Sequence, residues 1–282
     1  MRDIAIGQYY PVDSVMHRLD PRVKILAVLI YIVTIFFIDT FIAYGGLLLF
    51  LTAVILLSHV PPLKVLKSLR MIVYLVVFTV LITLLFYNGK PDDLLWQWWI
   101  VKIYRTAIHS SLKMALRIMF LIVGPTMLTF TTTPVALTDG VERLLAPLKL
   151  IRVPVHSIAM IMSIALRLIP TLVEEMDKIK NAQKARGADF DSKNIFKRAI
   201  SLVPVLIPLF VSSFRRANDL ADAMDSRCYR GAKGRTRMKV LRLTAKDFAA
   251  MLIMAAVLFM FLWLNFNFFP GLVDFRALPW FV

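Results

Sequence analysis

The sequence is poor in the residues that usually carry chemistry. It contains a single cysteine, Cys228, and only four histidines in 282 residues, His17, His59, His109 and His156. One cysteine excludes an intrachain disulfide, and histidines with this spacing match no metal-binding pattern. A phosphate-binding loop of the form G-x-x-x-x-G-K followed by Ser or Thr is missing, as are a Ser-His-Asp order and a carboxylate pair at membrane depth. We therefore expect a chain that is not an enzyme and binds no cofactor itself.

Acidic residues are scarce as well. The chain has 18 aspartates and glutamates against 34 lysines and arginines, which gives a formal net charge of +16. The excess is concentrated in residues 143–246, where 21 basic residues stand against 8 acidic ones. Such asymmetry follows the positive-inside rule and indicates cytoplasmic segments of a membrane protein rather than a nucleic-acid-binding surface. We expect anionic membrane lipids among the partners, and no nucleic acid.

The apolar content indicates a membrane protein. The chain is 59% hydrophobic with a mean hydropathy of +0.71, which is more apolar surface than a soluble domain of this size could bury. Residues 1–20 are polar and lack an apolar core before a small-residue cleavage site, so we expect no removable signal peptide. The composition therefore predicts an all-α, polytopic protein of the cell membrane.

Five apolar runs are predicted to span the membrane: 23–38, 41–57, 71–87, about 105–130, and 248–269. The basic connector at 61–70 belongs in the cytoplasm together with the N-terminus, and Trp96, Trp98 and Trp99 form a cluster typical of the outer interface. The predicted division has three parts. These are an N-terminal membrane part with four spans (1–130), a cytoplasmic coupling platform (131–246), and a C-terminal span with a tail (247–282).

The fourth run carries a stripe of titratable side chains. Arg105, His109, Lys113 and Arg117 follow one another at four-residue spacing, which places them on one helical face. Cations at membrane depth are usually functional or paired, but such a stripe also suits packing against neighbouring helices with the long side chains reaching an interface. Both interpretations stay open. After this run, the sequence Thr131-Thr132-Thr133-Pro134 predicts the start of a short helix that ends near residue 145.

Two segments of the middle region are ambiguous, because 155–173 and 199–214 are apolar enough to be scored as transmembrane. The stretches that follow them, 174–198 and 215–246, are both basic and belong on the cytoplasmic side, and a single crossing would separate them. Their apolar residues also form a helical stripe that leaves the opposite face polar. We therefore predict two long crossed helices in or below the membrane interface. The stripe consists of Ile161, Ile164, Leu168, Leu172, Met176 and Ile179.

The two helix-like segments end alike, with an arginine at each tip. The first tip is Ala185-Arg186-Gly187 and the second is Ser226-Arg227-Cys228. A cation in the last turn is explained by capping and the helix macrodipole alone, but two similar tips in one chain also suit a pair of acidic grooves. Arginine binds carboxylates bidentately and stays charged when desolvated. Because Cys228 stands where the first tip has Gly187, we expect the second helix to continue slightly farther.

With these residues in view, the chain resembles the transmembrane coupling subunit, or T component, of energy-coupling factor (ECF) vitamin transporters. The fragments that carry the resemblance are Gly7-Gln8-Tyr9, residues 17–22 (HRLDPR), Thr131-Thr132-Thr133-Pro134, residues 165–170 (ALRLIP), Ala185-Arg186-Gly187 and Tyr229-Arg230-Gly231. The resemblance implies that Arg186 and Arg227 enter grooves on two ABC-type ATPase subunits, which bind ATP and Mg²⁺. It also implies a separate small substrate-binding membrane subunit (S component) held by the membrane helices and the platform. The second tip departs from the usual Ala-Arg-Gly.

Methionines on the platform, Met160, Met162 and Met176, suit a partner surface that must repack, although ordinary helix packing is the simpler explanation for any one of them. Two other classes of function stay open. A self-contained secondary transporter would need substrate or ion ligands near the midplane and would transport without ATPases. A membrane-bound enzyme would need clustered acid, base or metal groups at one interface.

Overall fold

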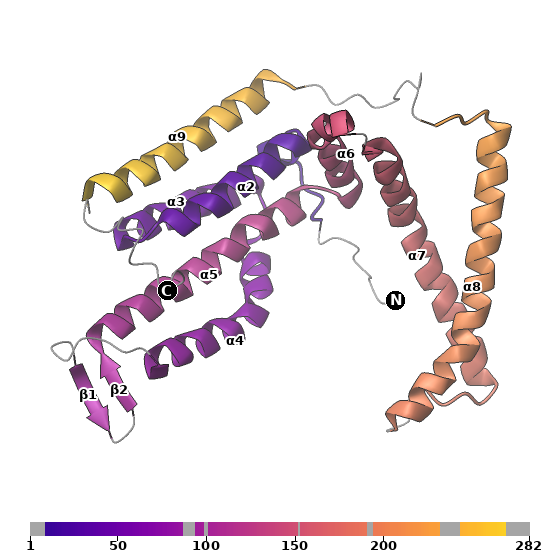
Figure 1. Cartoon of the computed structure of the whole chain (residues 1–282), viewed down its shortest axis with the longest axis horizontal. Coiled ribbons are helices and arrows are strands. Elements are labelled where there is room, and N and C mark those ends of the chain that lie inside the picture. Colours follow the sequence, from indigo (N-terminus) through magenta and orange to yellow (C-terminus); the bar gives the residue numbers. More distant parts are fainter. Residues whose placement is uncertain are drawn as a thin grey trace. The chain divides into compact units, whose positions relative to one another are not determined.

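The computed structural model describes residues 9–86, 94–98, 101–151, 153–190, 194–231 and 243–268. These residues form helices and one two-stranded antiparallel hairpin (Figure 1). The α-helices are α1 (Val15–Arg18), α2 (Pro21–Phe37), α3 (Phe41–Ser58), α4 (Pro62–Phe86), α5 (Arg105–Thr131), α6 (Pro134–Leu144), α7 (Val155–Ala185), α8 (Ile195–Ser226) and α9 (Ala245–Phe268). The 3-10 helix is η2 (Ala146–Ile151), and the strands are β1 (Leu94–Trp98) and β2 (Val101–Tyr104).

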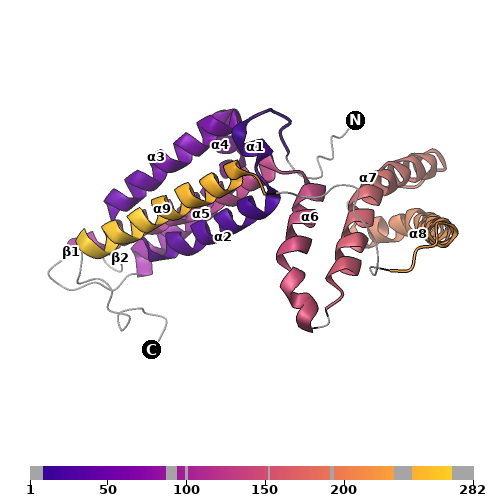
Figure 2. The same ribbon diagram turned by 90° about the horizontal axis from the view of Figure 1, so that it is seen from above.

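Contacts divide the chain into two compact units. The larger unit comprises residues 7–141 and 241–282, and the smaller unit comprises residues 1–6 and 142–240. In the larger unit α5 is central, because α2, α3 and α4 all pack against it. Helix α9 packs against α2 and α3, so the C-terminal part of the chain returns to its N-terminal helices (Figures 1 and 2).

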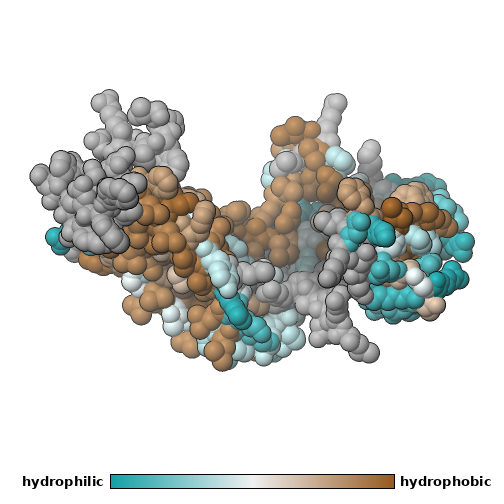
Figure 3. Space-filling view, turned by 90° about the horizontal axis from the view of Figure 1, so that it is seen from below, coloured by the Kyte–Doolittle hydropathy of each residue, from teal (hydrophilic) through white to brown (hydrophobic). Residues whose placement is uncertain are grey.

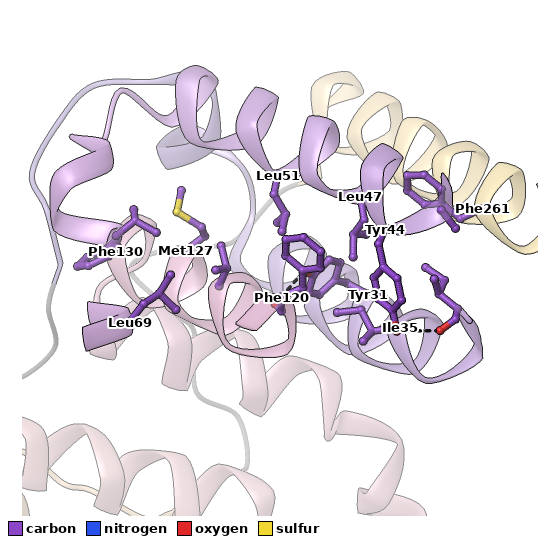
Figure 4. Packing of buried hydrophobic residues seen from close by; sticks show 14 of the residues in the cluster. Tyr31, Ile35, Tyr44, Leu47, Leu51, Leu69, Phe120, Met127, Phe130 and Phe261 are labelled. Carbon is purple, nitrogen blue, oxygen red and sulfur yellow. Dashed lines mark hydrogen bonds between the residues drawn. The ribbon is translucent and has the colours of Figure 1, made fainter. Parts of the chain in front are cut away.

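The core of the larger unit is built around α5 (Figure 4). The ring of Tyr31 lies directly on Gly124, where any side chain would collide with it. This close approach lets the Tyr31 hydroxyl donate a hydrogen bond to the Phe120 carbonyl at 2.8 Å, which satisfies a polar atom that would otherwise be buried without a partner. The surrounding apolar side chains come from α2, α3, α4, α5 and α9 and include Ile35, Tyr44, Leu47, Leu51, Leu69, Met127, Phe130 and Phe261.

The side chains that precede α2 and α6 cap the first turns of these helices. Asp20 caps α2 by accepting a hydrogen bond from the Arg22 N–H at 2.9 Å, and Pro21 occupies the first turn, where its missing N–H has no cost. Thr133 caps α6 in the same way by accepting a hydrogen bond from the Ala136 N–H at 3.3 Å. The helix predicted after the threonine run is thereby confirmed.

Two features of the larger unit were not predicted from the sequence. The basic connector is itself helical, because α4 begins at Pro62, and the helix bends by 53° between Pro62–Arg70 and Ile72–Phe86. The tryptophan-rich stretch forms the β1–β2 hairpin, as suits a segment of aromatic and β-branched residues. Trp99 and the turn that precedes β1 lie outside the described residues.

The predicted all-α, polytopic fold is confirmed. Among the described residues, α3, α5, α7 and the segment Ala199–Ser226 of α8 are long and apolar enough to cross a membrane, and α4 adds a fifth candidate if its bent parts form one span. Helices α2 and α9, with 17 and 24 residues, also fall in the range of about 17–25 residues for a span. The face of the larger unit seen in Figure 3 is mostly hydrophobic. As expected, hydropathy alone does not separate α7 and α8 from true spans, so their cytoplasmic placement stays a prediction.

Candidate functional site

The candidate site is the pair of long helices α7 and α8 in the smaller unit. The two helices cross (Figure 1). Near the crossing, Glu175 of α7 accepts hydrogen bonds from the Ser212 hydroxyl and from Nη2 of Arg216, the latter at 2.5 Å. Hydrogen bonds between ionised groups are stronger than neutral ones. Glu175 therefore fixes the point at which α8 crosses α7.

Helix α7 ends in a Schellman motif. Arg186 is the C-cap residue, and Gly187 follows it with φ of 89°, in the left-handed region. The Gly187 N–H donates to the Lys184 carbonyl and the Ala188 N–H donates to the Gln183 carbonyl, both at 3.0 Å. Glycine adopts this conformation without steric cost, which explains why the helix stops directly after the arginine.

Helix α8 ends in the same motif. Arg227 is the C-cap residue, the Cys228 N–H donates to the Asp225 carbonyl at 2.8 Å, and the Tyr229 N–H donates to the Met224 carbonyl at 3.0 Å. Cys228 has φ of 55° and so takes the place of Gly187. The expectation that this helix continues farther is wrong, because Cys228 adopts the left-handed conformation in spite of its Cβ, at a cost of about 1 kcal/mol.

The two arginines thus hold equivalent positions. Both are exposed, and neither forms an ion pair with another described residue. The C-terminal ends of α7 and α8 lie at opposite ends of the crossed pair (Figure 1). Arg186 comes 11 residues after Glu175, and Arg227 comes 15 residues after Ser212, or roughly 16 and 22 Å along a helix. The small neighbours Ala185 and Ser226 are exposed as well and leave each guanidinium accessible.

The crossed helices also expose an extended apolar surface. Only 11% of the apolar window of α7 and 6% of that of α8 are buried, against 28% in α3 and 33% in α5. Of the three platform methionines, Met162 and Met176 are exposed and Met160 is half-buried. Such large contiguous apolar surfaces indicate contact with a partner or with lipid. On α8 the surface consists of Phe196, Ile200, Val203, Leu206, Ile207, Phe210, Val211 and Phe214.

A second polar cluster, in the larger unit, brings together fragments on which the family resemblance rests. The ammonium group of the buried Lys24 has three acceptors, the His17 carbonyl (3.3 Å), the Thr131 carbonyl (2.9 Å) and the Thr132 hydroxyl (3.2 Å). The carboxylate of Asp247, at the start of α9, accepts hydrogen bonds from the N–H groups of Asp20 and Thr244, each at 2.8 Å. Sequence reasoning missed both roles. The available signal was an isolated charge at the start of an apolar run.

The N-terminal residues of this cluster are held in part by an uncharged histidine. Burial lowers the pKa of His17, although the hydrogen bond to the Tyr10 carbonyl opposes this shift. Nε2 of His17 lies 3.0 Å from that carbonyl oxygen, and Nδ1 lies 2.7 Å from the Ser14 hydroxyl. The neutral ring with its proton on Nε2 satisfies both contacts, so His17 ties the residues before α1 to α1 itself.

The cationic stripe of α5 faces the connection between α2 and α3. Nη2 of Arg117 lies 2.6 Å from the Asp39 carboxylate and 2.9 Å from the Ile38 carbonyl. Nζ of Lys113 lies 5.5 Å from the centre of the Phe41 ring. Arg117 is therefore a paired charge that stabilises a helix connection, and the partner that sequence reasoning lacked is Asp39.

The groups that this arrangement presents suit recognition of a partner. Among the residues that the structure describes, no group of three or more His, Cys, Asp or Glu side chains is placed to hold a metal ion. What the smaller unit does offer is two accessible guanidinium groups on rigid helix ends, which suit bidentate binding of carboxylates.

Comparison with known proteins gives consistent matches over most of the chain. Residues 13–240 match the family described as cobalt transport protein (CbiQ). The chain is 52% identical over 247 residues to the energy-coupling factor transporter transmembrane protein EcfT of Ruminiclostridium cellulolyticum, which covers 88% of this chain and 91% of that protein. It is 50% identical over 252 residues to the protein of the same name from Clostridium kluyveri, covering 89% and 93% of the two chains. It is 42% identical over 262 residues to the one from Bacillus subtilis, covering 92% and 98%.

Proposed function

Because the chain belongs to the cobalt transport protein family and to the transmembrane proteins of energy-coupling factor transporters, we propose that it couples two ATPase subunits to a separate substrate-binding membrane subunit. In this proposal the chain is a non-catalytic scaffold for vitamin uptake, and ATP and Mg²⁺ are bound by the ATPases. The N-terminus and residues 131–246 lie on the cytoplasmic side of the cell membrane, where their basic residues are favoured.

The observation that carries the proposal is the equivalence of the two tips. One arginine at a helix end is explained by the helix macrodipole, but macrodipole stabilisation does not require the same residue at the C-cap of the same motif twice. Two equivalent arginine tips would fit two equivalent grooves, one on each ATPase subunit. Each guanidinium would enter an acidic groove of one ATPase and bind a carboxylate there bidentately.

In this proposal, the contact at the helix crossing makes the two arginine tips move together. Glu175 joins α7 and α8 through Ser212 and Arg216, so a displacement at one tip is passed to the rest of the pair. When the two ATPase subunits bind ATP and close on each other, the distance between their grooves would change. This change would tilt the crossed helices. The exposed apolar faces of α7 and α8, with Met162 and Met176, would follow this motion with the substrate-binding subunit packed on them.

The test is co-purification of the complex from membranes in mild detergent. Wild type should retain two ATPase subunits and hydrolyse ATP. The double variant Arg186→Glu/Arg227→Glu should insert into the membrane normally but lose both ATPases, because each groove would then meet a like charge.

A matched control carries the same charge reversal on the same two helices away from the tips. Lys178 and Arg215 are both exposed, so Lys178→Glu/Arg215→Glu should keep both ATPases. If the control variant lost the ATPases to the same extent, the positive charge of the two helices as a whole, and not the arginine tips, would hold the complex together. An active wild type that never retains an ATPase would instead favour a self-contained transporter.

A further inference from the structure

The larger unit contains an apolar cavity that the proposed coupling mechanism does not use. Its volume is about 530 Å³, within the range of roughly 300–1,000 Å³ typical of ligand pockets. It lies among α1, α2, α3, α5 and α9, where small residues leave the space unfilled. These are Ala27, Ala53, Ala249 and Ala250.

Nearly every polar group that lines this cavity already has a partner. The Tyr31 hydroxyl donates to the Phe120 carbonyl, and the Thr131 hydroxyl donates to the Met127 carbonyl. The Lys24 ammonium is held by its three acceptors. Apart from Lys246, the described side chains of the walls therefore offer an occupant no free hydrogen-bond donor, which favours an apolar group there.

The exception is Lys246, which is exposed at one end. It lines both the apolar cavity and an adjoining polar pocket of about 460 Å³. In that pocket the carboxylate of Asp13 is neutralised by Arg18 at 2.7 Å, which also holds the pKa of Asp13 below its usual value. The buried Asp247 is engaged by two backbone N–H groups. Lys246 thus leaves one cationic group available where the apolar walls end.

The length of the cavity identifies its occupant. Along α9 the lining residues run from Lys246 to Val257, 11 residues or roughly 16 Å. This is about half of the ~30 Å hydrocarbon thickness of a bilayer, and therefore the reach of an acyl chain from one leaflet. The surrounding helices belong to the membrane part of the chain, so lipid is the available apolar partner.

We propose that this cavity binds one anionic phospholipid, with an acyl chain between α2, α3 and α9 and the phosphate at Lys246. The proposal does not depend on the coupling function and goes beyond diffuse attraction of lipid to basic residues. A bound lipid would fill the space between α9 and the N-terminal helices and so support the packing of α9.

The experiment is native mass spectrometry of the full-length chain in mild detergent with added phosphatidylglycerol or phosphatidylcholine of identical acyl chains. Wild type should retain one phosphatidylglycerol in preference to phosphatidylcholine. Lys246→Gln should lower phosphatidylglycerol retention about fivefold, since one lysine near an anionic headgroup gives about this effect, and should lower phosphatidylcholine retention less, because choline offsets the charge of the phosphate. Ala250→Phe should lower retention of both lipids by filling the cavity.

Two further variants keep the test decisive. Lys67→Gln removes an exposed cation of the larger unit that lies outside the cavity and should leave retention unchanged. Ala53→Leu fills the cavity from the facing helix and should act as Ala250→Phe does, in case the larger substitution prevents folding. An equal loss with Lys67→Gln, or full retention in a folded cavity-filling variant, would overturn the proposal.

Discussion

Single side chains in this protein are placed by partners far away in the sequence, and Arg117 is the plainest case. Its guanidinium reaches from α5 to Asp39 and to the Ile38 carbonyl, in the short connection between α2 and α3. The Arg117 side chain is 24% exposed and the Asp39 side chain 46%, so water screens this ion pair and its contribution to stability is modest. Arg117 therefore stabilises a helix hairpin whose own residues are almost entirely apolar.

We expect Arg117→Met to lower the free energy of unfolding by about 1 kcal/mol, because the substitution removes the ion pair with Asp39 and one of the hydrogen bonds to the Ile38 carbonyl. The measurement is the thermal unfolding midpoint in detergent. Arg105→Met is the matched control, since Arg105 lies on the same stripe but is exposed. Equal midpoints for the two variants would contradict a specific role for Arg117.

The spacing of the four stripe residues was sufficient to predict that they share a helical face, but not which of them is paired. Pairing depends on Asp39, 78 positions away, and the sequence marks Asp39 only as an interruption between apolar runs. The same limit applies to Lys24 and Asp247. Their partners are largely backbone groups, and backbone groups leave no pattern in a sequence.

At the scale of elements, the bounds of α2, α3, α5 and α9 follow the apolar runs closely, because each run is about as long as a membrane is thick. The bend of α4 and the β1–β2 hairpin were not predicted, because the packing of α4 against α5 and the pairing of β1 with β2 leave no pattern like that of the apolar runs. The end of α8 was predicted wrongly for a local reason. Propensity favours glycine after the last helical turn, and here Cys228 adopts the same backbone conformation.

Substituting the residue that follows each C-cap should change the stability of the two helix ends in opposite directions. A Cβ at Gly187 would meet no atom within 4 Å, so Gly187→Ala tests backbone strain alone. We expect Gly187→Ala to weaken the cap by about 1 kcal/mol and to speed amide exchange around Ala188 about fivefold. Cys228→Gly should slow exchange around Tyr229. Hydrogen exchange with mass detection measures both, and a tip that exchanges alike in wild type and variant would contradict the role of these caps.

At the scale of the whole molecule, the chain divides its tasks between two compact units. The larger unit buries an apolar core, whereas α7 and α8 bury little of their own surface and are joined by few polar contacts. This division suits a scaffold in which one unit anchors the chain and the other transmits force. A transmission element needs a rigid crossing more than it needs a large core.

Loosening the crossing should therefore uncouple transport from ATP hydrolysis without dissociating the complex. We expect Glu175→Ala to retain both ATPases but to lower vitamin uptake about fivefold or more, since the tips would no longer move as one body. Uptake into membrane vesicles and co-purification give the two readouts. Glu174→Ala, at an exposed neighbouring position, should leave both unchanged. Loss of the ATPases in Glu175→Ala would show that the contact holds the tips in place rather than coupling them.

In the proposed complex, each arginine tip contacts an ATPase. This contact is tested most directly by photo-crosslinking in membranes from Ala182 and Ala223, which are exposed and lie one helical turn before Arg186 and Arg227. A photo-reactive residue at either position should capture an ATPase subunit, and one at the exposed Leu56 of α3 should capture none. Capture from neither tip in a transport-active complex would contradict the account.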